Sequence, residues 1–427
     1  MQVPIISVTG TKGKTTTVAV IDDALRAMGY NTLRVDTKGH FVNGEQRSTL
    51  QDSNDVWQLV PTKAPGRYLW EFHNNPELSN DAVAVLECSL GCSRGCGLGY
   101  ASHDVGIFLN VFEDHLGSAD RLKSREDIAY AKKFVFENIQ RHDAYAVFNA
   151  DDELVVRMLN ETNFGNKQVS LVPVGLTFSE YDIAPHLEAG GVVVTMDSNR
   201  SNVILRSKKE DQILACLDDI PWTFNGAFMP SVWNMMFACA GLYGVLKGNM
   251  PDSFRSSMES VRLDRYGGRL TVLKARNGAT IIADYAHEKV SLESIGKLAR
   301  TICDEGKVVA VVRMAHDRTD ELLTETGKVI GKSFDTVVVY EKIDGFWRKP
   351  VNHGVIRFPQ VVGRTSEKVY QGVRSVNEDS VRILREDEAL QYAASIAAPE
   401  DVVVVIVNDD IKRSVEFIQT SFDAEFA

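Results

Sequence analysis

Residues 5 to 17 read Ile5-Ile6-Ser7-Val8-Thr9-Gly10-Thr11-Lys12-Gly13-Lys14-Thr15-Thr16-Thr17. A short apolar strand therefore runs directly into a loop of glycine, lysine and threonine. Gly10 and Gly13 let the backbone turn tightly, so that its N–H groups can face phosphate oxygens. Lys14 adds a positive charge, and the hydroxyl of Thr15 can bind Mg²⁺. The pattern predicts a phosphate-binding loop, or P-loop, for a nucleoside triphosphate.

The chain after the loop has the composition of a helix from Lys14 to Met28, with Gly29 as a natural stop. A loop that opens a helix presents the positive end of the helix dipole to an anion. The general P-loop pattern asks for a glycine at position 8, where this chain has Val8. The spacing indicates a variant loop, Gly-Thr-x-Gly-Lys-Thr. A glycine-rich turn before an ordinary helix is the alternative interpretation.

The composition is that of a soluble globular protein with 44% hydrophobic and 25% charged residues. A chain of 427 residues is long enough for two or three domains with substantial cores. The net charge of −11 argues against non-specific nucleic-acid binding through the phosphate backbone. No apolar stretch is long enough to cross a membrane, and no signal-peptide pattern is present, which favours a cytoplasmic protein.

Three of the six cysteines fall at four-residue spacing, in Cys88-Ser89-Leu90-Gly91-Cys92-Ser93-Arg94-Gly95-Cys96. Structural zinc sites usually combine such a close pair with a second, distant pair, which this sequence lacks. Thiols in a reducing compartment are the favoured interpretation, with a metal cluster as the alternative.

Short apolar runs alternate with helical segments through the first 150 residues. This alternation after a P-loop predicts a mostly parallel sheet with helices on both faces. A single helix is expected from Arg125 to Ile139, and a strand from Val105 to Val111. Several short strands between about 165 and 225 suggest a small antiparallel extension, and a helix is expected over Ser231–Leu246.

The pattern is interrupted between Leu263 and Gly268, where Asp264, Arg265 and two glycines occur. Strand–helix alternation then resumes, which predicts a second α/β unit with its own parallel sheet. We therefore expect an ATP-binding domain over residues 1–264, including the extension at 165–225, and a second domain over residues 265–427.

Polar residues follow two of the predicted strands at the point where each strand ends. Glu87 closes the apolar run 82–86, and Asp114 and His115 come just after the run that starts at Phe108. Ligands and catalytic groups collect at the carboxyl ends of strands in open α/β sheets. A carboxylate and an imidazole there can bind a divalent cation or a water molecule. A surface position is the alternative for Glu87.

Six motifs occur in one order along most of the chain: Gly10-Thr11-Lys12-Gly13-Lys14-Thr15-Thr16, Asn110-Val111-Phe112-Glu113-Asp114-His115-Leu116-Gly117, Asn149-Ala150-Asp151-Asp152, Gly267-Gly268-Arg269, Asp284-Tyr285-Ala286-His287 and Asp317-Arg318. This ordered set resembles the Mur ligase family, ATP-dependent enzymes that form an amide between a carboxylate and an amine. The resemblance implies an α/β fold in which a P-loop-containing, mostly parallel sheet domain (the Mur ligase central domain) precedes a smaller Rossmann-like α/β C-terminal domain.

Further segments look like the branch of the family that contains the ligase module of cyanophycin synthetase. These are Thr37-Lys38-Gly39-His40, Leu86-Glu87 through Gly97-Leu98-Gly99, and Asp104-Val105-Gly106. Because the P-loop begins ten residues from Met1, we expect neither the ATP-grasp module of that enzyme nor a UDP-sugar domain ahead of it. The chain is then either a standalone enzyme or an excised module.

The resemblance implies a metal site and a catalytic set. Lys14 would hold the triphosphate, and Thr15 and Glu87 would help to hold Mg²⁺. His115 would bind a second magnesium ion, and Lys132 would be carbamylated and bridge near the metals. An ordinary solvated helix lysine is the alternative for Lys132. With Arg269 from the second domain, the implied catalytic residues are Lys14, His115, Lys132 and Arg269.

The resemblance also implies how ATP is held. Asn234 would approach the adenine, while Arg269 and Asp284 would close over the phosphates and the ribose. The phosphates would lie on the loop residues Gly10, Thr11, Lys12, Gly13, Lys14, Thr15 and Thr16.

Substrate residues are expected in the second domain, where this family reads the incoming amino acid. His287, Arg318 and Arg348 are the candidates. The usual Asn-Pro after the histidine is Glu288-Lys289 here, which leaves the role of His287 open. An exposed basic-aromatic loop is the alternative for the segment that contains Arg348.

The implied reaction is ADP-forming ligation of an amino acid to an amino-acid or peptide acceptor. An acceptor carboxylate attacks the γ-phosphate to give an acyl phosphate, and the amine then displaces phosphate. Arginine and β-aspartyl acceptors are the first pair to consider by resemblance. Folyl- or poly-γ-glutamyl ligation, an inactive nucleotide-binding regulator or scaffold, and a simple phosphohydrolase are the alternatives. A homo-oligomer or a partner ATP-grasp ligase is left open.

Overall fold

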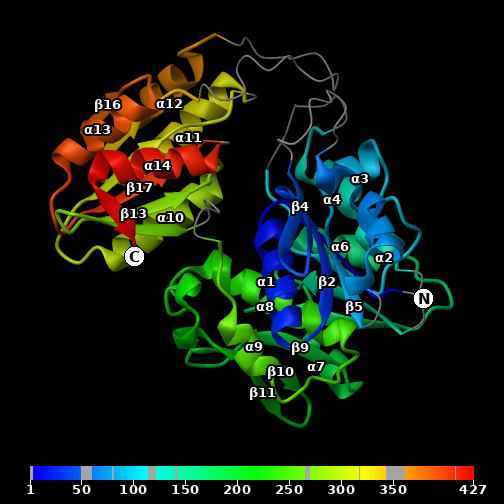
Figure 1. The fold of residues 1–427 in the computed structure, drawn as a ribbon. Helices are drawn as coiled ribbons and strands as arrows, with labels where there is room; N and C mark the ends of the chain where they lie inside the picture. The colour runs from blue at the N-terminus through cyan, green and yellow to red at the C-terminus, as the bar shows by residue number, and fades with distance from the viewer. Residues whose placement is uncertain are drawn as a thin grey trace. The chain divides into compact units, whose positions relative to one another are not determined.

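The computed structural model describes residues 3–49, 60–78, 81–113, 122–139, 143–264, 270–316, 318–342, 361–408 and 410–427. It divides into two compact units, Met1–Leu263 and Asp264–Ala427, and each has its own sheet (Figure 1).

The first unit is built on an eleven-stranded sheet. In spatial order its strands are β11 (Asp211–Cys216), β10 (Asn202–Ser207), β9 (Val192–Met196), β8 (Val169–Val174), β7 (Ala144–Asn149), β6 (Val105–Phe108), β1 (Ile5–Thr9), β5 (Ala82–Glu87), β2 (Asn31–Asp36), β3 (Gly39–Val42) and β4 (Glu45–Thr49). The strands from β9 to β2 run parallel, while β10, β11, β3 and β4 pair antiparallel with their neighbours. The mostly parallel sheet predicted for this unit is confirmed.

The predicted antiparallel extension is only partly correct. Strands β8 and β9 are parallel to β7 and continue the main sheet, and only β10 and β11 are antiparallel. The runs 169–174 and 192–196 are short and apolar, a pattern that does not distinguish a parallel strand from an antiparallel one.

Helices cover both faces of this sheet because successive residues of a strand point to opposite sides. Ile6 and Val8 of β1 pack in a core with α1 (Lys14–Ala27) and α8 (Met229–Val245). Ile5 packs in a second core on the other face. That second core includes side chains of α4 (Arg125–Lys132), α5 (Phe134–Glu137) and α6 (Glu153–Asn160). The other helices here are α2 (Glu71–Asn74), α3 (Gly91–Arg94), α7 (Ile183–Glu188) and α9 (Phe254–Ser260).

The single helix expected from Arg125 to Ile139 is wrong, because two helices meet at Lys133. The amide of Lys133 donates to the carbonyl of Tyr130, an i→i−3 bond that tightens the last turn of α4. Phe134 and Phe136 of the following short helix α5 are both buried in the core. Hydrophobic spacing alone does not distinguish this interrupted helix from a continuous one.

The second unit contains a seven-stranded sheet. Its order is β16 (Ser380–Arg382), β15 (Thr336–Val339), β14 (Val308–Val312), β17 (Val402–Ile406), β13 (Thr280–Asp284), β12 (Thr271–Ala275) and β18 (Ala424–Phe426). The first five strands run parallel, and β12 pairs antiparallel with both of its neighbours, β13 and β18. Its helices are α10 (Lys289–Ile302), α11 (Asp320–Ser333), α12 (Arg364–Arg374), α13 (Glu386–Ile396) and α14 (Ile411–Phe422).

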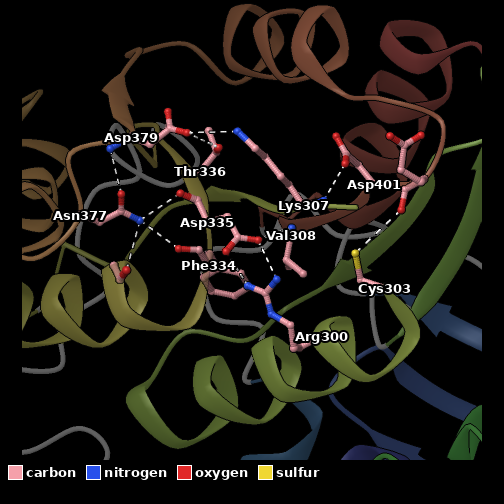
Figure 2. A network of polar contacts seen from close by, with 12 residues as sticks. Arg300, Cys303, Lys307, Val308, Phe334, Asp335, Thr336, Asn377, Asp379 and Asp401 are labelled. Carbon is pink, nitrogen blue, oxygen red and sulfur yellow. Dashed lines mark hydrogen bonds and ion pairs between the residues drawn. The ribbon is translucent and has the colours of Figure 1, made fainter. Parts of the chain in front are cut away.

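A polar network ties the amino ends of the parallel strands in the second unit (Figure 2). The carboxylate of Asp335 accepts the backbone N–H of Val308 and both terminal nitrogens of Arg300, at 2.7 to 2.8 Å. The hydrogen bond from Arg300 holds the pKa of Asp335 below its usual value. The side-chain amide of Asn377 donates to the carbonyls of residues 331, 334 and 335. This edge is occupied by structural bonds, so the carboxyl edge is the one available for ligands.

Candidate nucleotide and metal site

The loop between β1 and α1 needs its two glycines both for backbone conformation and for space. Gly13 has φ of 88°, and a Cβ there would lie 2.3 Å from Oδ1 of Asn234. Gly10 has φ of 151°, and its Cβ would lie 2.8 Å from Cβ of Leu109. Side chains at both positions are excluded by contact with neighbouring elements. The residues predicted as a P-loop therefore form a tight turn against α8 and the segment after β6.

Gly13→Ala is expected to lower the free energy of unfolding by more than 1 kcal/mol and to abolish ATP binding, because the Cβ displaces Asn234. Gly29→Ala is the matched control: Gly29 has φ of 90° but open space around its Cβ, so only backbone strain of about 1 kcal/mol applies. Chemical denaturation and ATP titration measure both effects. Equal losses of ATP affinity in the two variants would contradict the proposed tight contact.

Asn110 holds the loop from the next strand. Its Oδ1 accepts the backbone N–H groups of Thr11 and Lys12, at 3.1 and 2.9 Å, and its Nδ2 donates to the carbonyl of Lys12. The hydroxyl of Thr11 accepts the N–H of Phe112 in return. Sequence reasoning did not assign this role to Asn110, although it is the first polar residue after the apolar run that ends at Leu109.

The motif Asn149–Asp152 hydrogen-bonds to the segment 109–111, which contains Asn110. Asn149 donates to the carbonyl of Leu109, and Asp152 accepts the N–H of Val111. Arg125 donates to the Val111 carbonyl from α4. These bonds explain why the strand predicted to reach Val111 ends at Phe108, since side chains take the place of the sheet ladder. The motif thus holds Asn110 in place, and Asn110 holds the P-loop.

Lys14, Thr15 and Glu87 meet at the carboxyl ends of β1 and β5. Nζ of Lys14 donates to the carbonyls of Gly10 and Thr11, both at 3.0 Å. The hydroxyl of Thr15 donates to Oε2 of Glu87 at 2.8 Å. Glu87 is 1% exposed, so the surface interpretation is wrong. A hydroxyl and a carboxylate side by side are the oxygen ligands that suit Mg²⁺.

Asn234 reaches this loop from α8. Its Oδ1 accepts the hydroxyl of Thr17 at 3.4 Å and lies against Gly13. The structure therefore places Asn234 beside the P-loop.

Lys132 is 3% exposed at the end of α4, which contradicts the solvated alternative. The charge of Lys132 acts on the thiol of Cys92, so the two side chains lie near each other. A hydrogen bond with Cys88, and then burial, raise the pKa of the Cys92 thiol, and the charge of Lys132 opposes this rise. The neighbouring Lys133 is the more solvated of the two lysines, and its Nζ donates to the carbonyl of Glu161.

Asp36 lies beside Glu87 because Val35 pairs with Leu86 in the preceding register. Burial raises the pKa of Asp36 to about 6; the charge of Arg34 lowers it and the charge of Glu87 raises it. The folded state therefore binds this proton more tightly than the unfolded chain does. The resulting stabilisation is complete below the unfolded pKa near 4 and is lost as the pH rises through 6.

Asp36→Asn removes this titration. Relative to the wild type, the variant should gain on the order of 3 kcal/mol of unfolding free energy between pH 4 and pH 7. Its amide oxygen can still accept the N–H of Lys38, which Oδ1 of Asp36 accepts at 2.8 Å. Urea denaturation of both proteins across this range measures the difference. A difference that is independent of pH would contradict the raised pKa.

The remaining predicted residues divide into two groups. Asp284, His287 and Arg318 lie in the second unit: Asp284 accepts the N–H of Leu270 at 2.9 Å, and Nδ1 of His287 donates to the carbonyl of Tyr285. Arg318 is buried, and its carbonyl accepts a bond from an arginine of α12. The other group lies outside the described residues and consists of His115, Arg269 and Arg348.

Within the described part of the chain, no helix has the length and apolar character that a membrane span requires.

Two family models match the chain. The Mur ligase middle domain matches residues 8–204, and the Mur ligase glutamate ligase domain matches residues 268–406. The order of the two models is the order of the two units.

Curated relatives match nearly the whole chain. Cyanophycin synthetase of Nostoc sp. is 27% identical over 98% of this chain and 42% of its own length. The chain thus spans less than half of that relative. UDP-N-acetylmuramoyl-L-alanyl-D-glutamate–2,6-diaminopimelate ligase of Bacillus cereus is 24% identical over 94% of this chain and 72% of its own length.

Solved structures share the fold. MurF ligase from Thermotoga maritima, in complex with ADP, superposes with a TM-score of 0.60 at 15% identity. The match covers 99% of this chain and 81% of the MurF chain. The bifunctional folylpolyglutamate synthase/dihydrofolate synthase from Yersinia pestis, with AMPPNP and a manganese ion, gives a TM-score of 0.63 at 17% identity. This match covers 98% of this chain and 89% of the other. With both of its domain types matched in order, the chain belongs to the Mur ligase family.

Proposed function

We propose that this protein is an ADP-forming ligase that joins the amine of an amino acid to the carboxylate of an amino-acid or peptide acceptor. The observation that carries the proposal is the contact between Thr15 and Glu87 beside the P-loop lysine. Family membership and the relatives support the same class of reaction.

The reaction has two steps. The acceptor carboxylate forms a bond to the γ-phosphorus of ATP while the bond to ADP breaks, which gives an acyl phosphate. The amine then attacks the acyl carbon, loses a proton, and expels inorganic phosphate. Stabilising negative charge on the transferring oxygens is the main demand of the first step.

The described residues fit that demand. Nζ of Lys14 donates to two carbonyls of the loop on which the phosphates would lie. Thr15 and Glu87 would hold Mg²⁺, which supplies positive charge to the phosphate oxygens. The loop N–H groups of Thr11 and Lys12 donate to Oδ1 of Asn110, so these two groups hold the turn in place rather than bind phosphate.

Other parts of the site are proposed from the family resemblance. His115 would hold a second magnesium ion, and a carbamylated Lys132 would bridge near the metals. Asn234 would approach the adenine, with Arg269 and Asp284 closing over the nucleotide. The burial of Lys132, which is 3% exposed, is consistent with a place inside such a site.

The setting of the reaction is also proposed. A cytoplasmic location follows from the reducing environment that six free thiols favour. A homo-oligomer or an ATP-grasp ligase is the proposed partner, and the second rests on the resemblance to the branch that contains cyanophycin synthetase.

Mass spectrometry of products tests the substrate class. The wild-type protein is incubated with ATP, Mg²⁺, pooled amino acids and pooled peptide acceptors, starting with arginine and β-aspartyl acceptors. We expect a product heavier than its acceptor by one amino-acid residue, with equal amounts of ADP and phosphate. A rate of ATP hydrolysis that no amine and no acceptor changes would contradict the proposal and favour a phosphohydrolase. Selective addition of glutamate to a γ-carboxylate would favour the folyl- or poly-γ-glutamyl alternative.

A further inference from the structure

Three cysteines follow Glu87 at four-residue spacing, and the proposed reaction uses none of them. Cys88 is 0% exposed, Cys92 is 6% exposed, and Cys96 is exposed. All three are free thiols. The set therefore extends from the surface to the residue that adjoins the proposed metal carboxylate.

Cys88 is fixed at the end of β5 by the strand that leads into the P-loop. Its backbone N–H donates to the carbonyl of Val8, and its own carbonyl accepts the hydroxyl of Thr9, both at 2.9 Å. Its Sγ lies 3.5 Å from the hydroxyl of Tyr100. A change at the thiol of Cys88 thus acts on the strand end that carries Glu87.

Cys92 is the thiol partner of Cys88, and a hydrogen bond joins the two side chains. The backbone N–H of Cys92 donates to the carbonyl of Ser89 at 3.1 Å, so Cys92 lies one turn after Cys88, in α3. Sγ of Cys92 also donates to the carbonyl of Thr62 at 3.1 Å. Two thiols in contact within one turn of backbone need only a small movement to form a disulfide.

Cys96 is the member of the set that an oxidant in solution can reach. Its backbone N–H donates to the carbonyl of Gly91 at 3.0 Å, which holds it beside the first residues of α3. Oxidation of a cysteine follows its exposure. The hydrogen bond with Cys88 and burial raise the pKa of Cys92, which slows the direct reaction of this thiol with a peroxide. The exposed thiol is therefore the point of entry.

We propose that Cys88 and Cys92 form a redox site that a peroxide converts to a disulfide, with Cys96 as the entry thiol. The disulfide weakens Mg²⁺ binding at Glu87. This inference rests on the proposed metal site and adds regulation to it. A disulfide replaces both S–H donors, so the carbonyl of Thr62 loses a bond, and it pulls Cys88 toward α3. Groups that support a metal ligand change metal affinity by about 10- to 100-fold.

The chemistry balances with hydrogen peroxide as the oxidant. The thiolate of Cys96 attacks one peroxide oxygen, the O–O bond breaks, and a sulfenic acid and one water form once the thiol proton is taken up. Sγ of Cys92 attacks the sulfenic sulfur, and a second water leaves with the proton of that thiol. Sγ of Cys88 then displaces Cys96 from Cys92 by thiol–disulfide exchange, and its proton passes to Cys96. The buried pair has lost two hydrogen atoms, and peroxide has become two water molecules.

Peptide mapping of the wild-type full chain tests whether the disulfide forms. Tryptic cleavage gives a peptide, 68–94, that contains Cys88 and Cys92 but not Cys96. After hydrogen peroxide and alkylation, this peptide should carry no alkyl group and be lighter by two hydrogen atoms than its reduced form, and dithiothreitol should reverse the change. A peptide 68–94 that is alkylated at both thiols, or that is linked only to the peptide with Cys96, would overturn the proposal.

Calorimetric titration of Mg²⁺ into the protein saturated with AMPPNP measures the effect on the metal site. The oxidised wild type should bind Mg²⁺ about 10- to 100-fold more weakly than the reduced wild type. Cys92→Ser keeps a donor for the carbonyl of Thr62 and should bind Mg²⁺ like the reduced wild type, before and after peroxide. Cys88→Ser replaces it if that variant does not fold. Equal affinities of oxidised and reduced wild type, or a response retained in these variants, would overturn the proposal.

Cys303→Ser is the matched control for removing a buried thiol. Cys303 is 7% exposed, and its Sγ donates to the carbonyl of Glu400 at 3.8 Å in the second unit. This variant should keep the wild-type response to peroxide. Cys96→Ser should form the disulfide more slowly, and an unchanged rate would remove Cys96 as the entry thiol.

The two proposals fail in different ways. If ligation proceeds but peroxide changes neither peptide 68–94 nor the Mg²⁺ affinity, the redox site is wrong and the ligase function remains. If the disulfide forms and weakens Mg²⁺ binding but no amine-dependent phosphate appears, the ligase function is wrong and the redox site remains.

Discussion

Lys14→Ala should lower the kcat of ligation by about 10²- to 10³-fold or more, because it removes a cation from the transferring phosphate. Nζ of Lys14 lies 3.0 Å from two carbonyls of the loop that binds the triphosphate. Loss of these two bonds should cost only about 1–3 kcal/mol of stability, so the variant stays folded. Steady-state phosphate release and a thermal melt measure the two effects.

Lys133→Ala serves as the control for removing a lysine from the same unit. Among the described residues, its Nζ donates to the carbonyl of Glu161 and pairs with the exposed Glu137, so ligation should be unchanged. Wild-type turnover in a folded Lys14→Ala protein would exclude the P-loop as the ATP site. A similar loss in both variants would point to a general effect of charge.

Glu87→Gln should raise the Mg²⁺ concentration needed for half-maximal activity by about 10- to 100-fold. The substitution is nearly isosteric, and the amide oxygen can still accept the hydroxyl of Thr15. What it removes is the negative charge that a divalent cation needs. Activity measured against Mg²⁺ at saturating ATP gives the shift.

Glu71→Gln is the matched control, since Glu71 is another buried carboxylate of the first unit and pairs with His40 at 2.9 Å. Its Mg²⁺ dependence should equal that of the wild type. An unshifted Mg²⁺ dependence in Glu87→Gln would remove Glu87 from the metal site, whatever its effect on kcat.

The core of the first site could be predicted because its signals are local. A strand, a glycine loop and a helix are continuous in sequence, and Glu87 directly closes an apolar run. The strand-end position of Glu87 followed from this apolar run, and its place beside Thr15, 72 residues earlier, was implied by the family resemblance.

The supports of the site were not predictable, because their roles depend on distant partners. Asn110 acts on the loop about a hundred residues earlier, and Asn149 and Asp152 act on Asn110's segment. The parallel direction of β8 and β9 likewise depends on the chain path between them.

Oxygen-isotope transfer tests the acyl phosphate most directly. An acceptor with both carboxylate oxygens replaced by ¹⁸O is ligated by the wild-type protein, and the released phosphate is analysed by mass spectrometry. The carboxylate oxygen that attacks the γ-phosphorus stays on that phosphorus when the amine displaces phosphate from the acyl carbon. We therefore predict one ¹⁸O atom in each phosphate for every amide formed. Unlabelled phosphate, or AMP and diphosphate as products, would contradict this account.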